Sequence, residues 1–481
     1  MRRLAPFGLA CLFAGVVASP APAAVGSDVP SAFAPSVELP AGPAASAVVV
    51  ADVDKDAARD IVVANADSDD VSVLFGNGDG TFGSPSNFPV AAGPSAVRVA
   101  DMNRDGLPDI VVAHDIAGVL LVLVQGPPRT FTQSVEVETG EGPTGLDVAD
   151  LNRDGMLDAV TANAFELVGT LSVRFGRGDG TFFAGACADG MPCDTDSDCG
   201  EGSCLALELE TVPEDSELFT GPWAVRAIDV TGDRRVDLVA ANTDGANVAV
   251  LPGNGDGTFG EPRNFLVGEG PIALEVVDLD IDGHPDIVTV DEDDFTLSIL
   301  QGTGGGEFAG VGAVPVGEFP AAVSAWDFNL DGRPDLAVTG TVGDADAVSV
   351  LRGRADGTFE TREDFEIGGS GPVSVASGDL DGDRRRDLVT ANRDSEDPED
   401  AVSVLFNEAV LAVGDANVDG RVDEADLDRI LSEIFDGDGD GVIQVAGGAL
   451  QSGPGVDTSG DEKISAADLV AMALFVAEGQ G

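Results

Sequence analysis

An acidic loop that recurs seven times constrains the fold of this chain more than any other feature of its sequence. One copy reads Asp-Leu-Asp-Ile-Asp-Gly-His-Pro-Asp over residues 278–286. The intervals between the first carboxylates of successive copies are 49, 49, 79, 49, 49 and 52 residues. A nearly fixed period of this length predicts a repeat architecture, in which each unit packs against its neighbours.

Each loop offers side-chain oxygens at positions 1, 3, 5 and 9 and a backbone carbonyl near position 7. A hard cation of the size of calcium takes about six to eight oxygen ligands, so this spacing predicts a calcium site in every loop. Position 3 is always Asp, Asn or Thr, and each of these carries an oxygen. The predicted ligands are Asp52, Asp54, Asp56 and Asp60; Asp101, Asn103, Asp105 and Asp109; Asp150, Asn152, Asp154 and Asp158; Asp229, Thr231, Asp233 and Asp237; Asp278, Asp280, Asp282 and Asp286; Asp327, Asn329, Asp331 and Asp335; and Asp379, Asp381, Asp383 and Asp387.

The alternative interpretation of these loops is that Asp and Gly gather in tight turns without any cation. Turn chemistry alone does not require four oxygens at one spacing in seven copies, so we favour metal sites. Three loops lack the Gly at position 6 that eases a sharp turn, and carry Ala57, Arg234 and Arg384 there. The loop that also has Thr231 departs furthest from the pattern.

The net charge of the chain limits the classes of partner that it can bind. Its 86 acidic and 25 basic residues give a formal net charge of −61, which disfavours nucleic acid and anionic membrane surfaces as partners because both would repel it. Apolar residues make up 43% of the chain, too many for a disordered protein. Folded domains with acidic surfaces and bound cations are expected.

The N-terminus has the pattern of a secretory signal peptide over residues 1–23, with two arginines, an apolar run and the small-residue site Ala21-Pro-Ala23. We therefore expect a secreted or cell-surface protein with no membrane span in the mature chain. Cleavage of the signal peptide would remove Cys11 and leave four cysteines in the mature chain. These four lie within an insert at about 184–204, in the third repeat unit, and predict two disulfides with three possible connectivities. A zinc site is the alternative. The cysteines are Cys187, Cys193, Cys199 and Cys204.

Each repeat unit predicts four short strands, since β-branched and apolar runs alternate with Gly-rich turns. The turn Asn-Gly-Asp-Gly-Thr-Phe at 77–82 recurs at 177–182 and 254–259, and in part at 355–359. We assign its Asp-Gly pairs to hairpin geometry and its Phe to packing. In the second unit the predicted strands are 96–100, 109–113, 120–124 and 132–137.

Four strands in about 49 residues are typical of β-propeller blades. Together with the acidic loops and the Phe75-Gly76…Gly93-Pro94 signature, this pattern resembles the FG-GAP (VCBS) repeats of integrin α-subunits and of bacterial proteins. The resemblance spans residues 36–409 and implies an all-β seven-bladed β-propeller over residues 24–410. It also implies that the strand before each acidic loop is the innermost of its blade.

The ends of the repeat region predict how the ring closes. The seventh unit has no fourth strand after residues 402–406, while an unpaired segment at 35–39 precedes the first unit. Pairing these two segments would hide two open sheet edges. We therefore predict that residues 35–39 form the outer strand of the seventh blade.

Residues 411–481 change to a helical pattern with two twelve-residue calcium loops. The pair resembles a dockerin, which implies a small helical calcium-binding domain and a cohesin-like receptor as partner. Glu462 departs from the expected Gly, and Glu424-Ala425 and Ala466-Ala467 replace the hydroxyl pairs that read the partner in that family. Whether the Asp-Gly run at 436–441 is a linker turn or a third site stays open. The predicted ligands are Asp415, Asn417, Asp419 and Asp426, and Asp457, Ser459, Asp461 and Asp468.

Catalytic side chains are scarce, since the chain has no Tyr and only two histidines, His114 and His284. No catalytic triad can be drawn from them, and the sequence offers no pair of carboxylates that points to catalysis rather than to the calcium loops. We predict a secreted calcium-binding, non-catalytic adhesion or binding propeller with a dockerin-like tether, whose ligand is a protein or a glycan. The alternative is a polysaccharide-binding or polysaccharide-degrading component of a tethered complex.

Overall fold

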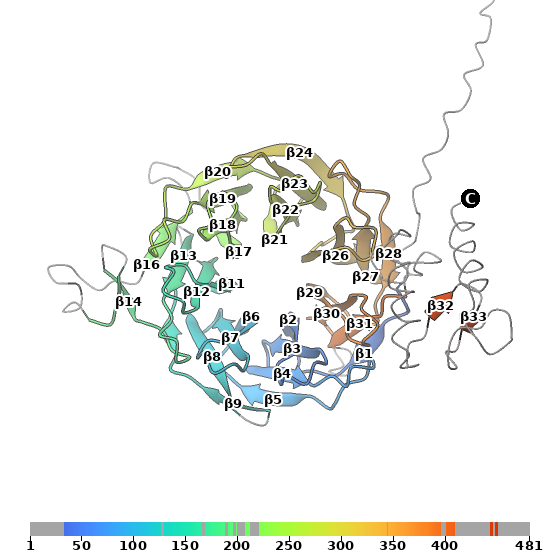
Figure 1. Cartoon of the computed structure of the whole chain (residues 1–481), viewed down its shortest axis with the longest axis horizontal. Coiled ribbons are helices and arrows are strands. Elements are labelled where there is room, and N and C mark those ends of the chain that lie inside the picture. Colours follow the sequence, from blue (N-terminus) through green and yellow to red (C-terminus); the bar gives the residue numbers. More distant parts are fainter. Residues whose placement is uncertain are drawn as a thin grey trace, which may run out of the picture.

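The computed structural model describes residues 33–408, apart from 127–128, 166–168, 188–190, 196–198, 200–206, 212–220, 344 and 396–400, together with 443–445 and 448–450. Seven antiparallel sheets stand radially around a central opening, each forming one blade of a β-propeller (Figure 1). No α-helix occurs in these residues. None of them belongs to a helix with the length and hydropathy needed to span a membrane.

Each of the first six blades runs from an innermost to an outermost strand in chain order. Blades 1 to 3 consist of β2 (Ala45–Ala51), β3 (Asp60–Asn65), β4 (Asp70–Leu74) and β5 (Ser86–Pro89); β6 (Pro94–Ala100), β7 (Asp109–His114), β8 (Val119–Gly126), β9 (Thr130–Gln133) and β10 (Val137–Glu138); and β11 (Pro143–Ala149), β12 (Asp158–Asn163), β13 (Thr170–Arg174) and β16 (Leu207–Glu210).

The remaining blades repeat this order. Blades 4 to 7 consist of β17 (Pro222–Ile228), β18 (Asp237–Asn242), β19 (Asn247–Leu251) and β20 (Arg263–Leu266); β21 (Pro271–Val277), β22 (Asp286–Asp291), β23 (Thr296–Gly302) and β24 (Phe308–Pro315); β25 (Val323–Trp326), β26 (Asp335–Val342), β27 (Ala345–Leu351) and β28 (Glu363–Glu366); and β29 (Pro372–Gly378), β30 (Asp387–Asn392), β31 (Val402–Leu405) and β1 (Val37–Leu39).

The predicted closure is confirmed: β1 is the outer strand of blade 7. Val37, Glu38 and Leu39 pair antiparallel with Val404, Ser403 and Val402 of β31. The N-terminal strand therefore supplies the edge that the C-terminal end of the repeat region lacks, and the ring closes through backbone hydrogen bonds.

The outer strand predicted at 132–137 in blade 2 is divided in two, which corrects the sequence analysis. Both β9 and β10 pair with β8. Between them, Ser134 donates its N–H to the Val122 carbonyl at 2.8 Å, and the Ser134 hydroxyl accepts the Val122 N–H at 3.0 Å. The hydroxyl takes the place of a backbone carbonyl in the ladder, so regular pairing breaks at this residue.

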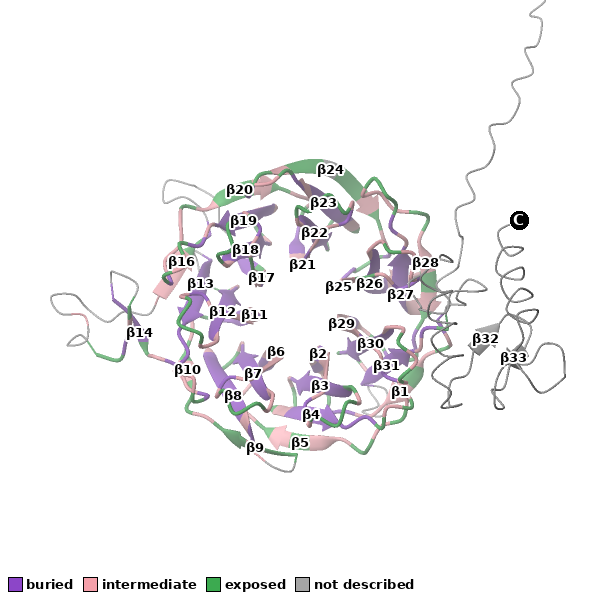
Figure 2. Ribbon diagram, in the orientation of Figure 1, coloured by how far each residue is buried: buried purple, intermediate pink, exposed green. Residues whose placement is uncertain are grey.

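The hydrophobic core lies between adjacent blades. One cluster joins Val63 and Leu74 of blade 1 to Val389 and Val404 of blade 7, and all four are completely buried. The second strands are buried on both faces because each blade is covered by two neighbours (Figure 2). This burial explains the continuous apolar runs that follow each acidic loop.

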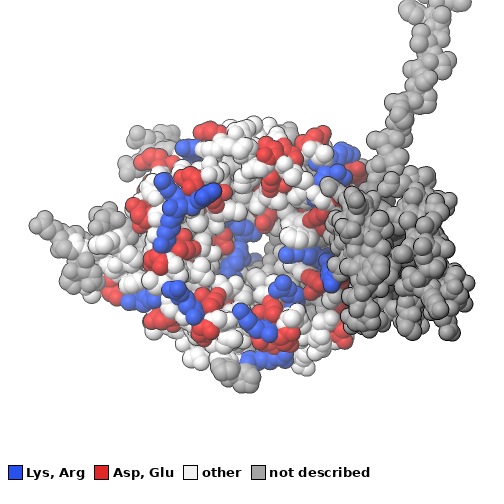
Figure 3. Space-filling view, viewed as in Figure 1, with Lys and Arg blue, Asp and Glu red and all other residues white. Residues whose placement is uncertain are grey.

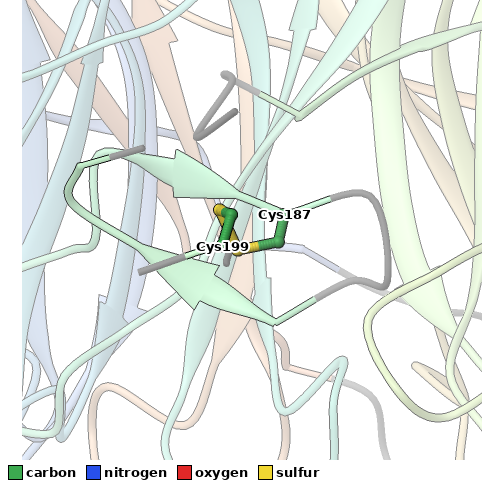
Figure 4. Close-up of a disulfide and its surroundings, with 2 residues drawn as sticks. All are labelled: Cys187 and Cys199. Carbon is green, nitrogen blue, oxygen red and sulfur yellow. A yellow bond between two sulfur atoms is a disulfide. The ribbon is translucent and has the colours of Figure 1, made fainter. Parts of the chain in front are cut away.

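The cysteine insert protrudes from the rim of blade 3, between β13 and β16, as expected from its place in the sequence (Figure 1). It contains the two-stranded pair β14 (Gly185–Ala186) and β15 (Pro192–Cys193). Cys187 and Cys199 form a disulfide, shown in Figure 4, and Cys193 is also disulfide-bonded. The disulfide interpretation is confirmed for these cysteines. A second short pair, β32 (Ile443–Val445) and β33 (Gly448–Leu450), lies in the C-terminal region.

Candidate metal sites in the acidic loops

All seven acidic loops connect the first and second strands of their blades, so they lie at equivalent places around the ring. In blade 1 the loop runs from Asp52, after β2, to Asp60, the first residue of β3. The innermost position of the preceding strand, implied by the family resemblance, is confirmed by the strand order (Figure 1).

The carboxylate at position 9 anchors each loop to its blade. In blade 1, Asp60 Oδ2 accepts the N–H of Val53 at 2.8 Å, and Oδ1 accepts the N–H of Gly76, just beyond the third strand, at 2.9 Å. The other six loops repeat both hydrogen bonds, with Asp109, Asp158, Asp237, Asp286, Asp335 and Asp387 as acceptors. Each of these seven carboxylates is at most 1% exposed.

Backbone N–H groups within the loop also hold side-chain oxygens at positions 1, 3 and 5. In blade 2, Asp101 accepts the N–H groups of Asp105 and Gly106 at 3.1 and 2.9 Å, and Asn103 Oδ1 accepts that of Asp105 at 2.9 Å. Asp105 in turn accepts the N–H of Leu107 at 2.8 Å. These bonds orient the oxygens without neutralising their charge.

The backbone of the loop requires a left-handed residue at positions 4 and 6. The three loops without Gly at position 6 keep this conformation, with φ of 76° at Ala57, 67° at Arg234 and 72° at Arg384. Such values are uncommon for residues that have a Cβ. The irregular loops therefore keep the left-handed backbone at position 6 although their residues there carry a Cβ.

Three of the loops bring three carboxylates close enough to share one cation. Candidate ligand oxygens of Asp52, Asp54 and Asp60 all lie within 4.8 Å of one another, as do those of Asp278, Asp280 and Asp282, and of Asp379, Asp381 and Asp387. Oxygens bound to one calcium ion at about 2.4 Å are at most about 4.8 Å apart. The spacing of these oxygens is therefore compatible with one calcium ion in each of blades 1, 5 and 7.

Burial makes the position-9 carboxylates unusually weak acids. Desolvation raises the pKa of Asp60 to about 6 and that of Asp158 to about 7, although two backbone N–H bonds oppose the shift in each case. Neighbouring loop carboxylates raise both pKa values further. A cation in the loop would stabilise the ionised form and remove this cost.

Arginines supply part of the countercharge in four loops, a feature that the sequence analysis missed. Arg129, from the turn before β9, pairs with Asp54 and with Asp56 at 3.2 Å, so it reaches from blade 2 to the loop of blade 1. The other three arginines belong to the loops that they neutralise; these pairs are Arg235–Asp233, Arg333–Asp331 and Arg385–Asp383. No local spacing signals the Arg129 contact, because its partners are more than 70 residues away.

The predicted C-terminal ligands Asp415, Asn417, Asp419, Asp426, Asp457, Ser459, Asp461 and Asp468 lie outside the described residues. The same holds for the run at 436–441 and for the helices of the predicted dockerin-like domain.

Comparison with known proteins supports the repeat assignment. A family model of the FG-GAP-like repeat matches residues 52–112, 229–289, 278–338 and 327–390, so the chain contains FG-GAP-like repeats. No curated protein matches the sequence.

Solved structures similar to this chain share its fold. BBS1N in complex with ARL6DN is 12% identical, with a TM-score of 0.50 over 78% of this chain and 98% of that chain. The periplasmic gluconolactonase PpgL of Pseudomonas aeruginosa is 17% identical, with a TM-score of 0.51 over 71% and 93%. A functionally unknown protein from Desulfotomaculum acetoxidans is 11% identical, with a TM-score of 0.50 over 72% and 92%. At these identities the similarity concerns the fold alone.

Proposed function

We propose that this chain, built on FG-GAP-like repeats, is a secreted calcium-binding propeller that binds a protein or glycan ligand without catalysis. In this proposal the dockerin-like C-terminal region attaches it to a cohesin-like receptor. The observation that carries the calcium assignment is the convergence of three loop carboxylates within 4.8 Å in blades 1, 5 and 7. The signal-peptide pattern and the Cys187–Cys199 disulfide support secretion.

The non-catalytic part of the proposal rests on how the candidate catalytic groups are used. His114 is completely buried, and His284 lies inside an acidic loop, where its backbone N–H donates to Asp282 at 2.8 Å. The buried position-9 carboxylates each accept two backbone N–H bonds. His114 and the position-9 carboxylates therefore take part in holding the propeller together.

Calcium would stabilise the ring by relieving repulsion within the loops. Two carboxylates about 4–5 Å apart repel by roughly 1 kcal/mol in water and by several times more at a lower effective dielectric. Several empty loops together would use up much of a typical stability of about 5–15 kcal/mol. We therefore expect the melting temperature to fall steeply when calcium is chelated, and magnesium to restore it poorly because it requires smaller octahedral sites.

The test compares melting curves of the mature protein in EDTA, in millimolar calcium and in magnesium. Asp282→Ala in blade 5 is the matched variant, because Asp282 is exposed and its loss removes repulsion as well as one ligand. Its melting temperature should drop below that of the parent in calcium but not in EDTA. Equal curves with and without calcium would refute the calcium assignment.

Binding and turnover need a separate assay. The purified mature chain is passed over immobilised polysaccharides and proteins, and both retention and released product are measured. Retention without product supports the binding role. Reproducible bond cleavage would overturn the non-catalytic assignment.

A further inference from the structure

Two arginines occupy position 8 of the acidic loops in blades 7 and 1, on either side of the ring closure. Arg386 and Arg59 stand where the other five loops have uncharged residues, namely Pro108, Leu157, Val236, Pro285 and Pro334. Within the described residues neither arginine forms an ion pair, although the chain has 86 acidic side chains and many of its other arginines are paired. Their positive charge is therefore available to a ligand.

The guanidinium of Arg386 is held in place by an aromatic ring. Its central carbon lies 3.7 Å from the ring centroid of Trp326, the last residue of the innermost strand β25. Trp326 is 43% exposed. The innermost strands surround the central opening (Figure 1). Trp326 ends one of these strands and Arg386 belongs to an acidic loop that follows another, so we infer that the pair lies at the end of the opening where the loops are. Figure 3 shows basic side chains beside the opening.

The hydrogen bonding of Arg386 leaves donors unused. Its Nη1 donates to Ser377, at 3.2 Å from the carbonyl oxygen and 3.3 Å from the hydroxyl. Among the described residues, no hydrogen bond is made by its other guanidinium nitrogens. Arg59 and Arg386 hold equivalent positions in adjacent blades, and burial and the charge of Arg59 both lower the pKa of Arg386.

The charged residues on the innermost strands pair with one another and leave these two arginines without a partner on those strands. The innermost strands of blades 2 to 5 carry two arginines and two carboxylates that pair with each other at 3.3 and 3.0 Å, Arg98 with Asp147 and Arg226 with Glu275. This group is neutral overall. Arg59 and Arg386 therefore remain without an ion pair among the described residues, beside an exposed tryptophan and between the acidic loops of a protein whose formal net charge is −61.

We propose that Arg59, Arg386 and Trp326 form a subsite for the carboxylate of an acidic glycan, such as a uronic acid residue. A guanidinium matches a carboxylate through two parallel hydrogen bonds, and an exposed indole supports the apolar face of a sugar ring. A single indole with two guanidinium groups has the size to contact one sugar unit, whereas a protein interface has a broader apolar centre. The subsite specifies a ligand for the binding role proposed above.

The test measures binding of polygalacturonate to the full mature chain by calorimetry at a fixed free calcium concentration. Arg386→Gln and Trp326→Ala should each weaken binding by about tenfold or more, and Arg59→Gln should weaken it in the same direction. Added sodium chloride should reduce binding to the parent. Arg104→Gln is the control, because it also removes an exposed arginine from an acidic loop, that of blade 2. This variant should bind polygalacturonate with the affinity of the parent. Melting temperatures verify that every variant is folded.

The outcomes separate this subsite from the general binding role. Equal affinity of the three variants and the parent would overturn the subsite. Stronger competition by a sulfated polysaccharide or an acidic peptide would overturn the assignment to a sugar carboxylate. If the chain retains a neutral glycan or a protein, and the three substitutions leave that binding unchanged, the subsite is refuted and the proposed function stands. Absence of any retained ligand would refute both.

Discussion

Single buried polar residues decide how each blade is held together. The position-9 aspartate joins the start of its own loop to the end of the third strand through both carboxylate oxygens, as Asp158 does with Leu151 and Gly176, each at 2.9 Å. At the other end of the second strand, Asn163 donates to Ser172 at 2.8 Å. A buried polar group without such partners costs stability, so these positions tolerate few substitutions.

His114 is the exception among these strand-end residues. It is completely buried, its Nδ1 lies 3.3 Å from the Val119 carbonyl oxygen, and no hydrogen-bond partner of Nε2 is found among the described residues. Burial lowers the pKa of His114 to about 4, although the Val119 hydrogen bond and the charge of Asp69 oppose this shift. The native state therefore keeps the imidazole neutral at pH values at which the unfolded chain binds a proton.

This difference predicts a loss of stability in acid that depends on one residue. The folded pKa lies below the unfolded value, so the unfolded state binds more protons between about pH 6.5 and pH 4, and stability falls as pH falls through that range. His114→Asn, which introduces the residue found in most other blades, should remove roughly 2 kcal/mol of the loss between pH 7.5 and pH 5. Urea unfolding of both proteins at the two pH values measures it. Parallel changes in the two proteins would contradict the prediction.

At the scale of the element, each Gly-rich hairpin turn packs over the acidic loop of the preceding blade. Gly80 of blade 1 donates its N–H to the Leu380 carbonyl of the blade 7 loop at 3.1 Å, and Gly180 of blade 3 donates to Met102 of blade 2 at 3.3 Å. The last residue of the turn motif contributes to the core, since Phe182 is buried. The hairpin and packing roles assigned to this turn are confirmed by the structure.

Substitutions in one such turn separate backbone strain from contact between blades. Gly255 and Gly257 both have a left-handed backbone, with φ of 76° and 86°. A Cβ at Gly257 would lie 2.6 Å from Cζ of the buried Phe175, whereas one at Gly255 would meet the flexible Arg153 at 3.2 Å. Gly257→Ala should therefore destabilise by about 1–3 kcal/mol more than Gly255→Ala. Chemical unfolding of the two variants gives the difference, and equal losses would show that blade contact is unimportant there.

At the scale of the whole molecule, the ring is closed by a strand from the opposite end of the repeat region. Beyond the ladder between β1 and β31, Glu38 accepts the N–H of Gly368 at 3.0 Å. Phe33 is 8% exposed and packs edge-to-face on Phe328 and Phe365, with ring centroids 6.0 and 5.2 Å apart. Closure therefore joins the N-terminal segment to both blade 6 and blade 7.

Removal of this segment should open the ring. A mature chain that begins at Ala41 lacks β1 and Phe33, so it exposes the edge of β31 and leaves Phe328 and Phe365 without their partner. We expect a lower melting temperature and aggregation during size-exclusion chromatography. A chain that begins at Ala32 keeps both features and is the matched control. Identical behaviour of the two truncations would refute closure by β1.

Much of the fold could be predicted because its signals are local and repeated. The strand patterns and the loop oxygens lie within single units and recur at a period of about 49 residues. The same pattern in several units makes the assignment of each one more secure. Closure by residues 35–39 also followed from the sequence, since it requires only counting strands. The seven loops and the turns at 77–82, 177–182 and 254–259 were correctly placed for the same reason.

The tertiary structure decided what depends on contacts between blades. Arg386 meets Trp326 across a blade boundary, and Arg129 reaches the loop of blade 1 from blade 2. The carboxylate of Asp60 bonds a backbone group 16 residues away, and the Ser134 hydroxyl interrupts a ladder that looked continuous. No period or motif encodes such contacts, because closing the ring brings together side chains whose sequence separations carry no local pattern.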